Sequence, residues 1–183
     1  MSDQKIGVGF VGAGWMGAML LKRLCERDDV QILGLNQRTR ESAESVLENL
    51  GLDKGLYTDR FEDLIENPDI DAIFVCSTNE VHGAQSIAAL KAGKHVFCEK
   101  PAATKFSEFQ QEIELEKANP ELITFVDYIM NFDTLEDRIR DMARRGDFGQ
   151  ITQIQVNYRH PINIADDKAW KLAADRMGDA IGM

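Results

Sequence analysis

Apolar stretches of strand length alternate with longer helical patterns over the first two thirds of this chain. The apolar stretches fall at residues 5–11, 30–36, 57–58, 71–76, 95–98 and 122–127. Helical patterns fill the intervals, at residues 15–26, 40–50, 61–66, 81–92 and 105–118. Such alternation is typical of βαβ units, which build parallel sheets. The chain is therefore predicted to form an α/β fold in which a doubly wound parallel sheet is covered by helices.

The pattern changes after residue 128. A charged amphipathic helix is predicted at residues 135–145, and apolar and polar residues then alternate from Ile151 to Tyr158, as in a half-buried strand. That strand would belong to an antiparallel sheet in a second domain. We therefore expect one complete domain at residues 1–128, followed by the beginning of an incomplete α+β domain at residues 129–183.

A glycine-rich stretch lies between the first predicted strand and the first helix. It has the spacing G-x-G-x-x-G, in which the first glycine allows a tight turn, the second lets a pyrophosphate approach the backbone, and the third lets helix pack on strand. A pyrophosphate would then rest on free N–H groups at the helix start. The pattern predicts a Rossmann dinucleotide site formed by Gly12, Ala13, Gly14, Trp15, Met16 and Gly17. The alternative is a glycine-rich turn that binds nothing.

The end of the second predicted strand reads Asn36-Gln-Arg-Thr-Arg40 and offers no carboxylate. In this fold an acidic residue there usually binds the adenosine ribose, whereas arginine accommodates a 2′-phosphate. Gln37 and Arg38 are therefore assigned to the cofactor, and NADP(H) is slightly favoured over NAD(H). In the alternative, Arg38 and Arg40 are solvated charges and Asn36 or Gln37 binds an unmodified ribose.

Charge and cysteine content exclude several classes of partner and site. Twenty-one basic against thirty-one acidic residues give a net charge of −10, which repels nucleic acids and anionic membranes, so neither is expected as a partner. The cysteines, Cys25, Cys76 and Cys98, lack CxxC spacing and are interpreted as reduced core thiols, with no metal site. No export signal or membrane-length apolar run is found, so a cytoplasmic protein is expected.

Four stretches of the chain together carry a family resemblance. They are residues 12–17, Cys-Ser-Thr-Asn-Glu-Val-His at 76–82, Ala-Gly-Lys-His-Val-Phe-Cys-Glu-Lys-Pro at 92–101, and Arg-Gly-Asp-Phe-Gly at 145–149. With them the chain closely resembles the glucose–fructose oxidoreductase and inositol dehydrogenase family, Gfo/Idh/MocA. The stretch ending in Glu-Lys-Pro is far more specific than the glycines alone.

The resemblance implies that cofactor-contacting residues follow the fourth and fifth strands. After the fourth strand these are Cys76, Ser77, Thr78, Asn79 and His82. His82 has the equal alternative of a purely structural hydrogen bond. After the fifth strand, Glu99, Lys100 and Pro101 resemble the family's nicotinamide-end residues, and the Lys100–Pro101 bond is a candidate for the cis form.

Lys100 is the catalytic residue that the resemblance implies. It would hydrogen-bond the substrate hydroxyl and favour loss of its proton while hydride leaves the adjacent carbon. Taken alone, a lysine at a strand end would instead be read as a surface charge with its stem packed along the protein.

The chain departs from the family pattern in its last part. The family usually supplies a histidine acid/base from the second domain, and the sequence ends before any such histidine. In an ungapped alignment Met183 takes the place of the accompanying aspartate, and Asn131 stands where many members carry arginine. His160, next to Pro161, is interpreted as a loop residue.

The resemblance implies an NAD(P)-dependent dehydrogenase that moves hydride to or from a secondary alcohol of a sugar, cyclitol or related polyol. Residues 129–183 would begin its substrate and oligomerisation domain, and the full-length form would be a homo-oligomer. We expect the 183-residue chain alone to bind cofactor but to turn over poorly or not at all. Two alternatives are a non-catalytic NAD(P)-binding sensor or interaction module that uses a sheet edge near residues 151–158, and a relative that uses transient oxidation for elimination or glycoside cleavage.

Overall fold

The computed structural model describes residues 5–157 of the chain. These residues divide into two compact units, 5–127 and 128–157, and each is described by itself. None of the helices in the described part is long and apolar enough to cross a membrane.

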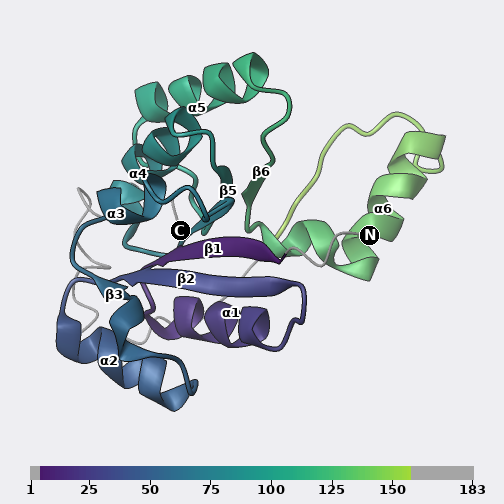
Figure 1. The fold of residues 1–183 in the computed structure, drawn as a ribbon. Coiled ribbons are helices and arrows are strands. Elements are labelled where there is room, and N and C mark those ends of the chain that lie inside the picture. The colour runs from purple at the N-terminus through teal and green to yellow at the C-terminus, as the bar shows by residue number, and fades with distance from the viewer. Residues whose placement is uncertain (1–4, 158–183) are drawn as a thin grey trace. The chain divides into compact units, whose positions relative to one another are not determined.

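The first unit is built on a six-stranded sheet in which every neighbouring pair is parallel. Its strands are β1 (Ile6–Val11), β2 (Val30–Asn36), β3 (Tyr57–Thr58), β4 (Ala72–Val75), β5 (His95–Cys98) and β6 (Thr124–Val126). They lie in the order β3-β2-β1-β4-β5-β6 (Figure 1). This is the doubly wound Rossmann order, and it confirms the predicted fold class.

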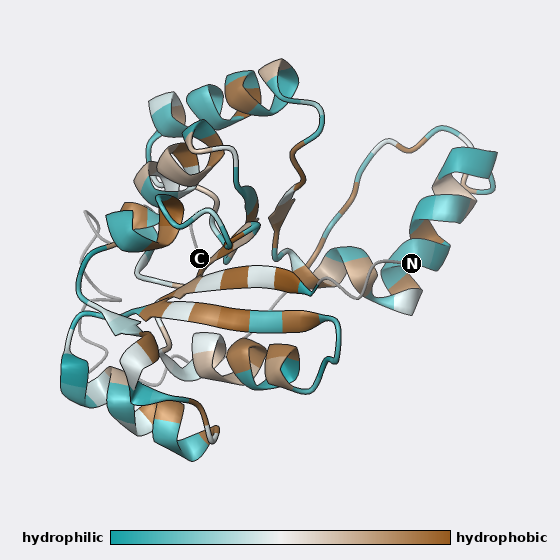
Figure 2. Ribbon diagram, viewed as in Figure 1, coloured by the Kyte–Doolittle hydropathy of each residue, from teal (hydrophilic) through white to brown (hydrophobic). Residues whose placement is uncertain are grey.

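Helices cover both faces of this sheet (Figure 1). They are α1 (Trp15–Cys25), α2 (Arg40–Asn49), the short 3-10 helix η1 (Lys54–Leu56), α3 (Glu62–Ile65), α4 (Asn79–Lys91) and α5 (Phe106–Ala118). Buried residues of α1 and α2 pack on one face, around Phe10 and Leu35. Residues of α3 and α4 pack on the other, around Ile73 and Val75. Figure 2 shows the apolar strands between helices with largely polar outer surfaces.

A row of four stacked phenyl rings crosses the sheet on the α1 face. Phe10, Phe74, Phe97 and Phe125 come from β1, β4, β5 and β6, and successive ring centroids lie 5.7, 4.6 and 5.3 Å apart. Offset stacking at such distances is favourable beyond the area that the rings bury. The row therefore links the central strand β1 to the short edge strand β6.

The second unit contains the 3-10 helix η2 (Ile129–Phe132) and the helix α6 (Thr134–Arg145). Asp133 caps α6 by accepting a 2.8 Å hydrogen bond from Leu135 N, and Gly146 ends it with φ of 77°. The predicted strand from Ile151 to Tyr158 is wrong for residues 151–157, which have no regular structure; Tyr158 lies outside the described residues. Alternation alone does not make a strand, because its backbone needs a partner strand to bond.

The thiols are distributed differently from the prediction. Cys76 and Cys98 are free and buried, as expected of core thiols. Cys25 is free but exposed, so its assignment to the core is wrong. It is the last residue of α1, where Leu24 rather than Cys25 packs against the core.

Candidate cofactor site

The residues assigned to the cofactor all follow the carboxyl ends of parallel strands. Residues 12–17 follow β1, 37–38 follow β2, 76–82 follow β4 and 99–101 follow β5. Strand order reverses between β1 and β4, and ligands of open α/β sheets bind in the crevice outside this switch point. The fold thus brings the assigned residues together at the carboxyl-terminal ends of the strands of one sheet.

Two glycines, one in the β1–α1 loop and one in the first turn of α1, are required by packing. Gly12 has φ of +81°, and a Cβ there would lie 2.6 Å from the Cys76 carbonyl oxygen. A Cβ at Gly17 would lie 2.1 Å from the Gly12 carbonyl oxygen. Both positions therefore exclude any side chain.

Gly14 differs, because a Cβ built on it meets nothing within 4 Å. It is the N-cap of α1 and offers no side-chain cap to the first turn of this 11-residue helix. Open space thus lies directly over a helix N-terminus, where backbone N–H groups favour an anion. These residues fit the pyrophosphate of a dinucleotide. Next to this space, Trp15 is 77% exposed and Met16 is half-buried.

Gln37 connects this loop to the start of α2. Its side-chain oxygen accepts a 2.8 Å hydrogen bond from Ala13 N, and its Nε2 donates to Ser42 Oγ at 2.9 Å. Both ends of the Gln37 amide are therefore engaged within the protein. The Gln37 side chain therefore holds the glycine loop in its conformation.

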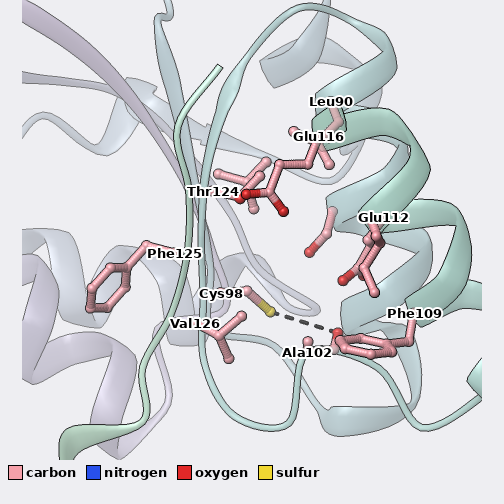
Figure 3. Close-up of a pocket in the computed structure, with 12 residues that line it drawn as sticks. Leu90, Cys98, Ala102, Phe109, Glu112, Glu116, Thr124, Phe125 and Val126 are labelled. Carbon is pink, nitrogen blue, oxygen red and sulfur yellow. Dashed lines mark hydrogen bonds between the residues drawn. The ribbon is translucent and has the colours of Figure 1, made fainter. Parts of the chain in front are cut away.

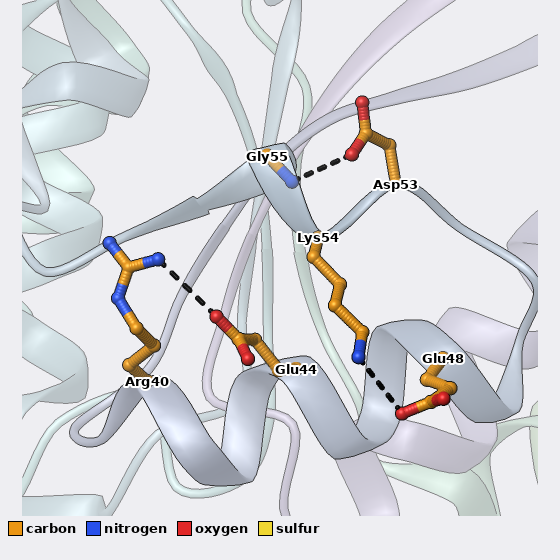
Figure 4. A network of polar contacts seen from close by, with 6 residues as sticks. All are labelled: Arg40, Glu44, Glu48, Asp53, Lys54 and Gly55. Atoms are coloured by element: carbon orange, nitrogen blue, oxygen red, sulfur yellow. Dashed lines mark hydrogen bonds and ion pairs between the residues drawn. The ribbon is translucent and has the colours of Figure 1, made fainter.

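The two arginines after β2 have different surroundings. Arg40 pairs with Glu44 at 3.3 Å and lies over the Tyr57 ring, 4.8 Å from its centroid. Figure 4 shows this pair on α2, beside the Lys54–Glu48 pair. Arg38 is exposed and has no ion-pair partner within residues 5–157. Arg38 is thus the guanidinium that is available to a ligand.

Residues after β4 form the start of α4. Ser77 Oγ donates to Gln85 Oε1 at 2.6 Å, Thr78 is the N-cap of α4, and Asn79 is buried. The pattern predicted this helix to begin at Val81, two residues later than it does. Burial raises the pKa of the Cys76 thiol, which favours its neutral form.

His82 joins the loops that follow β4 and β5. Its ring is buried, with Nδ1 2.8 Å from the Pro101 carbonyl oxygen and Nε2 3.1 Å from the Ser77 carbonyl oxygen. Each ring nitrogen thus faces a backbone acceptor, one from each loop. The histidine fixes the spacing of two segments that line the site.

The segment after β5 combines a buried acid with an exposed base. Glu99 is 9% exposed, its Oε2 accepts a 3.2 Å hydrogen bond from Lys100 N, and the Lys100 side chain reaches solvent. Burial, and next the charge of Asp127, raise the pKa of the Glu99 carboxyl. The Lys100–Pro101 bond is cis, as expected.

Asp127 lies beside this segment and was not among the predicted site residues. Its backbone N donates to the Cys98 carbonyl oxygen at 2.9 Å, which extends the pairing of β6 with β5. The signal in the sequence was that Asp127 is the first charged residue after an apolar strand. Placing it next to Glu99 required the strand register.

A separate small cavity of about 80 Å³ lies between α5 and the strands β5 and β6. Figure 3 shows Glu112 among its lining residues, near Cys98 and Phe109. Burial, and next the charge of Glu108, raise the pKa of Glu112 to about 8. Burial raises the pKa of the Cys98 thiol to about 12. The cavity is far too small for a dinucleotide.

Residues 6–128 match the sequence profile of GFO_IDH_MocA, described as an oxidoreductase family with an NAD-binding Rossmann fold. The chain belongs to this family. The match confirms the family resemblance and includes three of the four sequence stretches, since residues 145–149 lie beyond it.

Curated relatives within Gfo/Idh/MocA include inositol dehydrogenases. The myo-inositol 2-dehydrogenase of Thermotoga maritima is 30% identical over 154 residues, which cover 84% of this chain and 45% of the relative. The inositol 2-dehydrogenase of Salmonella typhimurium is 29% identical over 153 residues, covering 83% and 45%. The chain thus spans a little under half the length of these relatives.

Solved structures share the fold. The scyllo-inositol dehydrogenase of Lactobacillus casei with bound NAD(H) and scyllo-inositol superposes with a TM-score of 0.72 at 24% identity, covering 81% of this chain and 44% of that one. A 3-ketoreductase of Actinomadura kijaniata in complex with NADP gives 0.66 at 22% identity, covering 80% and 46%. At these identities the likeness concerns the fold.

Proposed function

We propose that this chain is the cofactor-binding part of an NAD(P)-dependent dehydrogenase acting on a secondary alcohol of a cyclitol, sugar or related polyol. The observation that carries the proposal is the open space at Gly14 over the N-terminus of α1, within a family described as NAD-binding oxidoreductases. The substrate class is supported by relatives that are named inositol dehydrogenases. When bound, the nicotinamide accepts or supplies the hydride.

The chain's own residues hold and orient the reactants in this proposal. Residues 12–17 bind the pyrophosphate, with Gly12 and Gly17 fixing the loop and Gly14 leaving room. Residues 76–79 line the site beside them, and His82 sets the distance between this segment and Pro101. Lys100 Nζ, exposed at the end of β5, hydrogen-bonds the substrate hydroxyl and stabilises the developing alkoxide.

We propose further that NADP(H) is preferred over NAD(H). Arg38 is exposed beside the β2 end and is not held by a carboxylate of the described residues, whereas Glu44 holds Arg40. A 2′-phosphate brings about −1.5 to −2 charges, which a guanidinium can bind with two parallel hydrogen bonds. The segment from Asn36 to Arg40 contains no carboxylate that would repel it.

Gly14→Val tests the proposed site. The isopropyl group enters open space, so the fold should remain, while the room for the pyrophosphate is lost. We expect titrations of the 183-residue chain with NADPH and NADH to show binding, and the variant to lose it by at least about a hundredfold. Gly14→Ala should give an intermediate loss. Undiminished binding by a variant with an unchanged circular dichroism spectrum and melting temperature would overturn the assignment.

A further inference from the structure

Side chains alternate between the two faces of the sheet along β4, β5 and β6, and this places a second row of side chains on the α1 face, next to the phenyl row. Phe74, Phe97 and Phe125 stack on the α1 face, whereas Val75, Cys98 and Val126 face α4 or α5. Successive side chains of a strand point to opposite faces, so the next position on the α1 face is Cys76, Glu99 and Asp127 respectively. The row ends in two adjacent acidic residues.

The strand register brings these two acids together. β5 and β6 are parallel with Cys98 paired to Val126, and the bond from Asp127 N to the Cys98 carbonyl oxygen continues the ladder. Glu99 and Asp127 are the next residues on the two strands, so their side chains start side by side on one face of the sheet. Two carboxyl oxygens can share a hydrogen bond only where one of them carries a proton.

The surroundings of Glu99 oppose full ionisation. The residue is 9% exposed, and Oε2 accepts the bond from Lys100 N. The other carboxyl oxygen of Glu99, Oε1, is buried and has no hydrogen-bond partner among the described residues. If both acids were ionised, neither could donate a hydrogen bond to it. A buried acceptor without a donor is costly, and one proton between the two acids satisfies it.

We propose that Glu99 and Asp127 form a proton-sharing carboxyl pair that holds one negative charge, instead of two, at the Lys100 end of the site. Lys100, the next residue after Glu99, is the neighbouring cation, and the Cys76 thiol after β4 and the Cys98 thiol on β5 are neutral neighbours. The upward direction of the Glu99 pKa agrees with the pair. Asp127 is thereby assigned to the site as a positioning residue.

The pair gives the site a charge that changes with pH, and this consequence rests on the proposed function. A second ionisation adds a negative charge near the place assigned to the nicotinamide, whose oxidised ring is cationic and whose reduced ring is neutral. The ratio of affinities for oxidised over reduced cofactor should therefore rise as the shared proton is lost. A tenfold change in this ratio corresponds to one unit of pKa difference between the two complexes.

Carboxyl ¹³C NMR of the 183-residue chain tests the pair without cofactor. The Glu99 and Asp127 signals are assigned by their loss in Glu99→Gln and Asp127→Asn. In the unsubstituted chain we expect the Glu99 signal to titrate above the ordinary glutamate value of about 4.3, in two steps because its proton is shared. A single-step titration of Glu99 near that ordinary value would overturn the pair.

Asp127→Asn should remove the upper step and lower the midpoint of Glu99, because the amide can donate to Glu99 and carries no charge. Glu112→Gln is the matched control: it removes another acid of raised pKa, on α5, and should leave the Glu99 titration unchanged. An unchanged Glu99 midpoint in a folded Asp127→Asn chain would also overturn the pair.

Titrations with oxidised and reduced cofactor at pH 5 and pH 9 complete the test. We expect the oxidised-to-reduced affinity ratio to rise about three- to tenfold with pH, and to stay constant in Asp127→Asn. If neither cofactor binds, the proposed function fails while the NMR result still decides the pair. If both bind with a pH-independent ratio, the effect of the pair on the site is wrong.

Discussion

The side-chain oxygen of Gln37 accepts a 2.8 Å hydrogen bond from the backbone N–H of Ala13, 24 residues away in the sequence. This bond ties the glycine loop to the end of β2. Because the Gln37 Nε2 donates to Ser42, the same side chain also reaches the first turn of α2. The shape of the glycine loop thus depends on Gln37, which stands near the position where this fold usually places a residue that binds the ribose.

Substitutions at Gln37 should separate loop shape from cofactor choice. Gln37→Leu leaves the Ala13 N–H without its acceptor, so we expect a loss of about 1–2 kcal/mol in the free energy of unfolding and weaker binding of both cofactors. Gln37→Glu keeps an acceptor but adds negative charge, so the fold should persist and the preference should shift toward NADH. Urea unfolding and fluorescence titrations of each variant measure the two effects. Equal losses for NADH and NADPH in Gln37→Glu would contradict this division.

Cofactor preference should depend on Arg38 and on salt. An exposed charge-assisted contact contributes up to about 1 kcal/mol, so NADPH should bind about three- to sixfold tighter than NADH at low ionic strength. The preference should narrow as salt rises and disappear in Arg38→Ala. Arg40→Ala is the comparison, because Glu44 already holds that guanidinium, and its effect should be smaller. NADH binding as tight as NADPH at low salt would reverse the proposal.

Lys100→Ala should lower kcat much more than it lowers cofactor affinity. This experiment needs a catalytically competent chain of the length of the curated relatives. A group that acts on the developing alkoxide contributes about 10²- to 10⁴-fold, and it does so in the transition state. Lys105→Ala removes a nearby exposed lysine, paired with Glu108, and should leave kcat unchanged. Steady-state kinetics with an unaltered kcat for Lys100→Ala would remove this residue from the mechanism.

Stability should fall as the pH rises from the ordinary glutamate range to about 8, the raised pKa of Glu112. A carboxyl whose folded-state pKa lies above its unfolded value stabilises the fold below the unfolded value and loses that contribution as the pH rises to the folded value. Glu112→Gln should therefore be more stable than the unsubstituted chain at pH 9, by roughly 1–3 kcal/mol after allowance for solvent screening, and nearly equal at pH 4. Glu114→Gln, on the exposed side of α5, is the control. Melting curves followed by circular dichroism at both pH values measure the difference, and parallel loss of stability in all three chains would exclude Glu112.

Much of the fold was predictable because it depends on local periodicity and on single positions. Strand β2 falls where the apolar run predicts it, and α1 differs from its predicted range by one residue at its end. Helix α4 begins at Asn79 instead of Val81, because Thr78 already provides the N-cap position. The strand predicted at residues 151–158 shows the limit of periodicity, since its pattern describes a face and gives no partner.

The site was predictable where a backbone requirement leaves a trace in the sequence, as at Gly12 and Gly17. It was not predictable where side chains meet across strands. The bond from Ala13 to Gln37 depends on the β1–β2 pairing, and the position of Asp127 next to Glu99 depends on the β5–β6 register. The spacing of these residues in the sequence predicts neither of the two relationships.

The row of phenyl rings fixes the register in which β6 pairs with β5. A slip of one residue would turn Val126 toward Phe97 and would send Phe125 to the opposite face, at the cost of a 5.3 Å ring contact. β6 has three residues and few backbone bonds with which to resist such a slip. The rings therefore decide which residue arrives opposite Glu99. The packing of Phe97 against Phe125 thus decides which two side chains, two residues further along each strand, form the proposed carboxyl pair.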